Sequence, residues 1–172
     1  MTAQVIAIDD RRAAARAALA AKPDGVIENV AREHGVPVRD VLAMLPAGES
    51  VAAPGSAFED VWNDVTGWGE ILFIVNTPDV VLECHGPLVK GSSGHGWFNV
   101  HGDSPIGGHL KASNCTEVCF VDRKFHGRRS LSIQFYNGAG EAMFKIFVRR
   151  DAQRELLPDQ IARFETLRAK YA

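Results

Sequence analysis

The second half of this chain is a series of short apolar segments separated by turn signals, and no other feature restricts the fold as much. Residues 71–75 (ILFIV) end in Asn76-Thr77-Pro78-Asp79, and a second apolar run begins at once. Apolar runs of this length, bounded by Asn, Pro, Asp and Gly, are typical of strands joined by tight turns. We therefore predict an antiparallel, meander-type β-sheet. Its predicted strands are 71–75, 80–82, 97–101, 108–113, 117–121, 131–136 and 142–148.

Apolar residues at helical spacing occupy the regions on both sides of these strands. Ser56, with Glu59 three positions later, predicts a capping box at the start of one helix. Helices that flank a sheet indicate an α+β architecture. We predict one domain over residues 23–172, preceded by an Ala-rich helical or frayed segment, residues 1–22. The predicted helices are 26–34, 37–45, 56–65 and 156–171, and the predicted loops include 46–55 and 91–96.

The composition argues against several classes of protein. No apolar stretch approaches the ~18 residues of a membrane span, and an apolar content of 46% is that of a globular chain. A net charge of −2 gives no overall electrostatic basis for binding nucleic acid. Three cysteines, an odd number, favour a reducing compartment over a disulfide scaffold. Because Arg16 interrupts the Ala-rich run, we expect no signal peptide and predict a cytoplasmic protein.

Two motifs are better explained by packing than by function. Residues 24–45 have the length of a helix-turn-helix, but the second helix offers only Arg39 to a base edge, with Asp40 beside it. Cys115 and Cys119, four apart in a predicted strand, would lie on one face about 13 Å apart, too far to share a metal. We interpret the helices as a packing module and the cysteines as small apolar core residues.

The histidines are unevenly placed, since five of the six lie within residues 85–126. In the predicted strand 108–113, His109 and Lys111 point to the same face about 7 Å apart, because side chains alternate along a strand. This arrangement places an imidazole that can bind a metal beside a cation that can bind a carboxylate. The pair is the most specific site feature that the spacing alone predicts.

Other residues could complete a haem site around this pair. Haem requires an axial nitrogen for its iron, burial for its face and positive partners for its propionates. Arg128 could supply a further cation and Phe144 an apolar floor, whereas the spacing of His95, His101 and His109 alone does not specify a metal site. The alternative is that these are surface histidines above a core of strand aromatics.

Several segments combine side chains that are unusual together. They are residues 94–102 (GHGWFNVHG), 107–112 (GGHLKA), 142–148 (AMFKIFV) and 154–160 (RELLPDQ). In this order they resemble the haem-utilisation cytosolic carrier family of the HutX/ChuX type, and the similarity extends over residues 22–170. The resemblance implies an antiparallel sheet flanked by helices, similar to one half of the larger HemS/ChuS-type proteins. It also implies a homodimer whose two chains imitate that double repeat.

The same resemblance implies a function and a ligand. The function is binding of haem in the cytosol for storage, trafficking or utilisation in iron acquisition, or protection of the cell from free haem, with partner proteins that deliver or degrade haem. The family histidine in the Gly-Gly-His-Leu-Lys stretch corresponds to His109, the expected axial ligand. A second family histidine, in a Val-His-Thr setting, corresponds to Asn76. Either one histidine suffices, or His85, His95 or His101 replaces the second, or haem binding is weakened.

Three functions remain open from the sequence. The first is a non-catalytic haem carrier. The second is a haem-degrading or metal-dependent enzyme, since a single axial ligand leaves the sixth iron position open, although no carboxylate pair or nucleophile–base set is recognisable. The third is a DNA-binding regulator built on residues 24–45.

Overall fold

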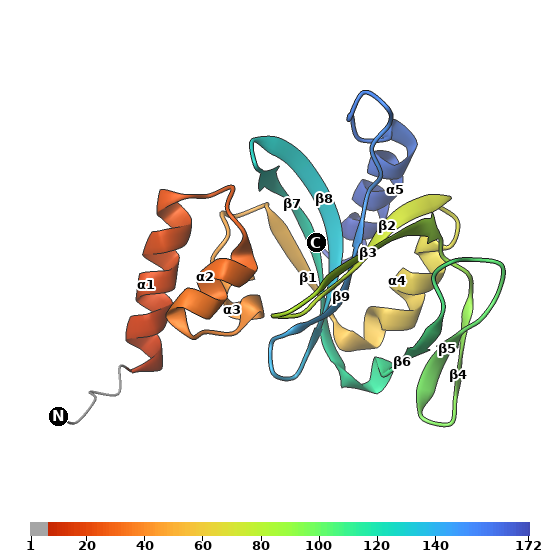
Figure 1. Ribbon diagram of the computed structural model, residues 1–172, viewed down its shortest axis with the longest axis horizontal. Coiled ribbons are helices and arrows are strands. Elements are labelled where there is room, and N and C mark those ends of the chain that lie inside the picture. Colours follow the sequence, from red (N-terminus) through yellow and green to blue (C-terminus); the bar gives the residue numbers. More distant parts are fainter. Residues whose placement is uncertain (1–6) are drawn as a thin grey trace.

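Six antiparallel strands form a large sheet in the computed structural model, which describes residues 7–172 (Figure 1). They are β1 (Ser50–Pro54), β2 (Glu70–Asn76), β3 (Val81–Pro87), β7 (Cys115–Phe125), β8 (Arg128–Asn137) and β9 (Ala142–Phe147). Their spatial order is β1-β7-β8-β9-β2-β3. The predicted β2–β3 hairpin and the β7–β8–β9 meander are confirmed, and the two are joined by pairing of β2 with β9.

A smaller sheet lies beside the large one. Its three strands, in order, are β4 (Gly91–Gly94), β5 (Trp97–Val100) and β6 (Gly108–Leu110). The predicted loop over 91–96 is wrong, because β4 pairs with β5 and a Cβ at Gly91 would lie 2.2 Å from the ring of Phe98. Glycine at this position makes room for an aromatic ring on the neighbouring strand and does not mark a turn.

The predicted loop over residues 46–55 is also wrong, because it contains β1. This strand pairs antiparallel with β7, with Ser50 opposite Val121. Since the partner strand lies far along the chain, the local pattern gives no indication of the pairing.

Helices flank the large sheet on both sides, and the fold is α+β as predicted (Figure 1). They are α1 (Ile8–Ala21), α2 (Ile27–His34), α3 (Val38–Leu42), α4 (Phe58–Val65) and α5 (Pro158–Ala169). Of the predicted segment 1–22, the first six residues lie outside the described residues and most of the remainder forms α1. Between residues 7 and 172, no helix is both long and apolar enough to cross a membrane.

Two details of the helices differ from, or add to, the prediction. Ser56 lies in a 3-10 turn before α4, and no side chain caps that helix by a hydrogen bond, so the capping box is wrong. Glu59 instead accepts a hydrogen bond of 2.5 Å from Ser93 Oγ, which links α4 to β4. In α3, which has only five residues, Arg39 lies within 4 Å of both Asp40 and Glu117.

Each face of the large sheet has its own hydrophobic core. Alternation along β7 directs Val118 and Phe120 toward α4 and α5, and Cys119 and Val121 toward α1–α3. The prediction that Cys115 and Cys119 share a face is wrong, because a bulge between positions 115 and 117 shifts the alternation. Both thiols are buried, and burial raises the pKa of each.

Candidate functional site

The three-stranded sheet has one buried face and one exposed face. Phe98 and Val100 on β5 are buried in the core that α4 covers, where Phe98 contacts Trp62, whereas Trp97, at the start of the same strand, is 43% exposed. Asn99 lies directly opposite the exposed His109 of β6. Alternation along β5 therefore places the side chains of Trp97 and Asn99 on the outer face, with His109 beside them.

We call this outer surface the histidine face; it comprises Trp97, Asn99, His101, His109 and Lys111. The imidazole rings of His101 and His109 are 5.2 Å apart between centroids, edge to face. The ring of Trp97 lies 6.4 Å from that of His109 and 4.4 Å from Lys111 Nζ. Two imidazoles, an indole and an ammonium group thus meet on one exposed surface.

Lys111 reaches this surface differently from the sequence prediction. The predicted strand 108–113 is too long, because β6 ends at Leu110 and Lys111 leads into a 3-10 turn over Ala112–Asn114. Strand alternation therefore does not place Lys111 beside His109. The cation–π contact with Trp97 does so instead, since the same indole contacts both side chains.

The remaining predicted site residues lie elsewhere. His95 occupies the turn between β4 and β5, close in sequence to the histidine face, with a positive φ of 52°. Phe144 is 1% exposed and stacks on Phe135 with ring centroids 4.3 Å apart, inside the core that α4 covers. Arg128 is exposed at the start of β8 and faces a pocket on the other face of the large sheet, the one that α2 covers. The structure brings together His101, His109 and Lys111 and leaves Arg128 and Phe144 outside this group.

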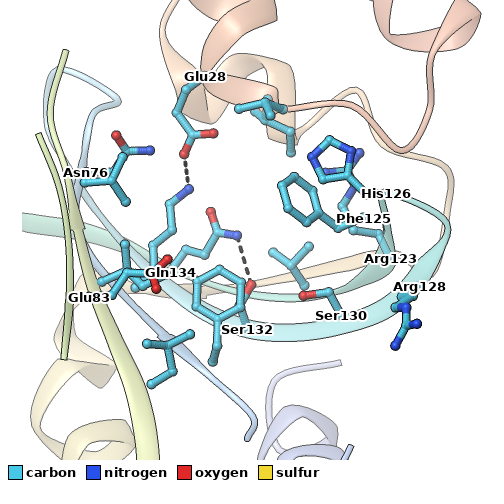
Figure 2. A pocket seen from close by; sticks show the side chains of 18 of the residues that line it. Glu28, Asn76, Glu83, Arg123, Phe125, His126, Arg128, Ser130, Ser132 and Gln134 are labelled. Atoms are coloured by element: carbon cyan, nitrogen blue, oxygen red, sulfur yellow. Dashed lines mark hydrogen bonds and ion pairs between the residues drawn. The ribbon is translucent and has the colours of Figure 1, made fainter. Parts of the chain in front are cut away.

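Sequence reasoning missed that pocket, which we call the sheet pocket. It has a volume of about 580 Å³. It lies between the start of α2 and the large sheet (Figure 2). Apolar side chains and three arginines share its wall. It is lined by Val26, Ile27, Glu28, Leu72, Ile74, Asn76, Val81, Glu83, Val121, Arg123, Phe125, His126, Arg128, Ser130, Ser132, Gln134, Lys145, Phe147 and Arg150.

A buried ion pair crosses the sheet pocket from α2 to β9. Lys145 donates a hydrogen bond to the Glu28 carboxylate, which Figure 2 draws as a dashed line from Glu28. The two side chains are only 9% and 17% exposed. Burial alone would raise the pKa of Glu28, but the charge and hydrogen bond of Lys145, together with Arg123, lower it below its usual value. The pair therefore holds a helix onto the sheet as two charged groups.

Arg123 is the second buried charge at this pocket, and it is 7% exposed. Its Nη2 donates to the backbone carbonyls of Pro23 at 2.5 Å and Gly25 at 3.0 Å, while its Nε has no hydrogen-bond partner. Burial lowers the pKa of this guanidinium, although carboxylates nearby oppose the shift. The arginine fastens the segment before α2 to β7.

The pocket has a recognisable signal in the sequence of β8. Ser130, Ser132 and Gln134 alternate with Leu131 and Ile133, and Ser132 and Gln134 are buried. Polar side chains at every second position of a strand commonly face solvent. Here they face a pocket, where Gln134 Nε2 donates to Ser132 Oγ at 2.9 Å. Asn76, where the resemblance implies a second family histidine, also lines this pocket and does not belong to the histidine face.

Comparison with known proteins identifies the family. The family model described as haem utilisation ChuX/HutX matches residues 51–167. The chain is also 32% identical over 143 residues to the intracellular heme transport protein HutX of Vibrio cholerae, covering 83% of this chain and 74% of HutX. This chain belongs to the haem utilisation ChuX/HutX family. The resemblance seen in the sequence motifs is thereby confirmed.

Solved structures of the same fold agree with this assignment. A protein from Agrobacterium tumefaciens is 52% identical, with a TM-score of 0.87 over 99% of this chain and 100% of that chain. The heme-binding protein ChuX is 40% identical, with a TM-score of 0.82 over 91% of this chain and 97% of ChuX. Half of PhuS from Pseudomonas aeruginosa (49% of that chain) shares the fold, with a TM-score of 0.71 at 17% identity. The predicted similarity to one half of a larger protein is confirmed at the level of the fold.

Proposed function

We propose that this chain is a haem carrier that binds the iron of haem through His109 and passes the haem on in the cytosol. The observation that supports it most is the histidine face, where an exposed imidazole lies beside an indole and an ammonium group. The imidazole can occupy an axial position of the iron, the indole can cover part of the porphyrin face, and the ammonium can bind a propionate. HutX, the relative from Vibrio cholerae, is an intracellular heme transport protein.

In this proposal a single chain supplies one axial ligand. The rings of His101 and His109 are in edge-to-face contact, so a porphyrin cannot lie between them in this arrangement. Asn76, on the sheet pocket, is too weak a ligand to replace a histidine and lies outside the histidine face. The exposed face leaves room for a second copy of the chain, as expected for a homodimer, or for the protein that receives the haem.

Titration with hemin tests the proposal. We expect the wild-type chain to shift the Soret band at micromolar concentration and His109→Ala to lose this shift, because the variant lacks the axial nitrogen. His126→Ala, which removes an exposed imidazole at the sheet pocket, is the matched control and should bind as the wild type does. The absence of a wild-type shift would refute haem binding. An unchanged shift in His109→Ala would refute the assignment of the ligand.

A second experiment separates a carrier from a haem-degrading enzyme. A site with one axial ligand leaves the sixth iron position open, which oxygen activation requires. We propose a carrier and expect the spectrum of the haem complex to persist when a reductant and oxygen are added in the presence of catalase. Loss of the Soret band with formation of a linear tetrapyrrole would show degradation and overturn the carrier proposal.

A further inference from the structure

The side-chain amide of Asn99 is held in one orientation by the turn beneath it. Its Nδ2 lies 3.2 Å from the carbonyl oxygens of Ser92 and Gly94 and 3.3 Å from that of Trp97. Carbonyl oxygens only accept hydrogen bonds, so the donor end of the amide must face these three groups. Its oxygen then points the other way, and it lies 2.6 Å from Nδ1 of His109.

This orientation determines where neutral His109 carries its proton. An amide oxygen cannot donate a hydrogen bond, so Nδ1 of His109 must be the donor. A neutral imidazole has one proton, and its other nitrogen then has a free lone pair. That nitrogen is Nε2, and a metal binds only an unprotonated nitrogen.

We propose that Asn99 is a positioning residue, which holds neutral His109 as the Nδ1–H tautomer and so reserves Nε2 for the iron of haem. The inference that Nε2 serves iron rests on the proposed function, whereas the tautomer is a property of the chain without haem. A hydrogen bond to the second nitrogen of a metal-binding histidine fixes the ring orientation and increases its strength as a ligand.

The local backbone explains why an asparagine can do this. Gly94 and Trp97 pair across a two-residue turn, His95-Gly96, in which both residues have positive φ, 52° and 77°. Such a turn follows the natural twist of a hairpin and brings both strands close together. The carbonyls of Ser92, Gly94 and Trp97 thereby converge on Nδ2 of Asn99. Because Asn99 lies directly opposite His109 on β6, its Oδ1 reaches the imidazole.

Two variants separate the role of the Asn99 side-chain oxygen, which accepts from His109, from that of the side-chain nitrogen, which donates to the turn. Asn99→Leu removes both ends of the amide, whereas Asn99→Asp removes the nitrogen and keeps an oxygen for His109. Both variants lose the hydrogen bonds that Nδ2 donates to the turn. Only Asn99→Leu should lose control of the tautomer, and Asn99→Asp should retain it.

The tautomer is measured without haem, by ¹⁵N NMR of the histidine rings in mildly alkaline buffer. We expect wild type and Asn99→Asp to show a protonated Nδ1 and an unprotonated Nε2 at His109. Asn99→Leu should show averaged signals from both tautomers. An Nε2–H tautomer in the wild type, or an unchanged Nδ1–H tautomer in Asn99→Leu, would overturn the inference.

Hemin titration and resonance Raman spectra then test the link to iron. The affinity of Asn99→Leu for hemin should fall about 10- to 100-fold, and its iron–histidine stretching band should weaken or shift, while Asn99→Asp keeps wild-type affinity within a few fold. If His109→Ala binds hemin normally, the proposed function at His109 fails, and with it the role of Nε2. If His109→Ala loses hemin but Asn99→Leu binds it normally, the positioning role alone fails.

Discussion

The histidine face and the sheet pocket contain similar chemical groups but use them differently. Both hold cations, aromatic rings and histidine. On the histidine face the two imidazoles and the indole are exposed, and the groups are held by the hydrogen bonds of Asn99 and by ring contacts. In the sheet pocket Lys145 and Arg123 are buried and join elements that are far apart in the sequence. The comparison indicates that ligand binding can be altered on the first surface at little cost in stability, whereas charges of the second hold the fold together.

The largest effect should follow removal of the buried amine from the sheet pocket. Lys145→Ala leaves the Glu28 carboxylate buried without its partner, so we expect the free energy of unfolding to fall by about 3 kcal/mol. Urea denaturation measures the loss. His109→Ala is the control on the histidine face and should stay within about 0.5 kcal/mol of the wild type, since it removes an exposed side chain. Equal losses in the two variants would contradict the comparison.

Acid should weaken the same ion pair to a smaller extent, because protonated Glu28 can still hydrogen-bond. The pKa of Glu28 is lowered in the folded chain, so the unfolded chain takes up the proton first as the pH falls. The contribution of the pair is complete above the ordinary value of 4.5 and is lost as the pH falls through the lowered pKa. Urea midpoints recorded between pH 7 and pH 3 measure this loss. Glu28→Gln should abolish this part of the pH dependence; a curve that keeps its wild-type shape would exclude Glu28 as the source.

The fold was predictable where partners are near in the sequence. The turn residues that follow Asn76 predict the β2–β3 hairpin, and residues 137–140 predict the turn between β8 and β9. β1 and β4 were missed for physical reasons: β1 pairs with a distant strand, and Gly91 in β4 accommodates the ring of Phe98. Local pattern carries information on turns and alternation but not on pairing at long range.

The candidate sites show the same limit. His109 and Lys111 were predicted to be neighbours by alternation along one strand. They are neighbours for another reason: β6 ends before Lys111, and both side chains contact the ring of Trp97. The sheet pocket is assembled from α2 and strands of the large sheet, and no short segment contains it. Within one short segment, the signal we recognise is the alternation of polar residues at 130, 132 and 134. A strand with one face in water has the same pattern, so this signal does not predict a pocket.

Removing one cation from each region tests where the carboxylates of haem are bound. If haem lies on the histidine face, Lys111→Gln should weaken hemin binding by up to about fivefold, since an exposed ion pair contributes up to about 1 kcal/mol. Arg128→Gln, at the sheet pocket, should leave the affinity unchanged. Fluorescence quenching by hemin at two salt concentrations measures both variants, and the lysine effect should shrink at the higher salt. The reverse ranking would place the propionates at the sheet pocket.

The smallest effect compares two turns of the same design, one in each region. His95-Gly96 joins β4 to β5, and His126-Gly127 joins β7 to β8; in both turns the histidine and the glycine have positive φ. Asn-Gly is favoured in such turns, because asparagine tolerates a positive φ. His95→Asn and His126→Asn should therefore each raise the free energy of unfolding slightly, by about 0.5 kcal/mol or less, as measured by urea denaturation.

Hemin titration of His95→Asn and His126→Asn compares the two turns a second time, by their effect on haem affinity. Neither side chain is needed if His109 is the axial ligand, so both variants should keep the wild-type affinity. A tenfold loss in His95→Asn, with normal stability, would make His95 a second ligand and extend the haem site from the histidine face to its turn. The same loss in His126→Asn would move the iron to the sheet pocket. Because both variants change an imidazole to an amide in the same backbone conformation, a difference between them reports the position of the haem and not the strain of the turn.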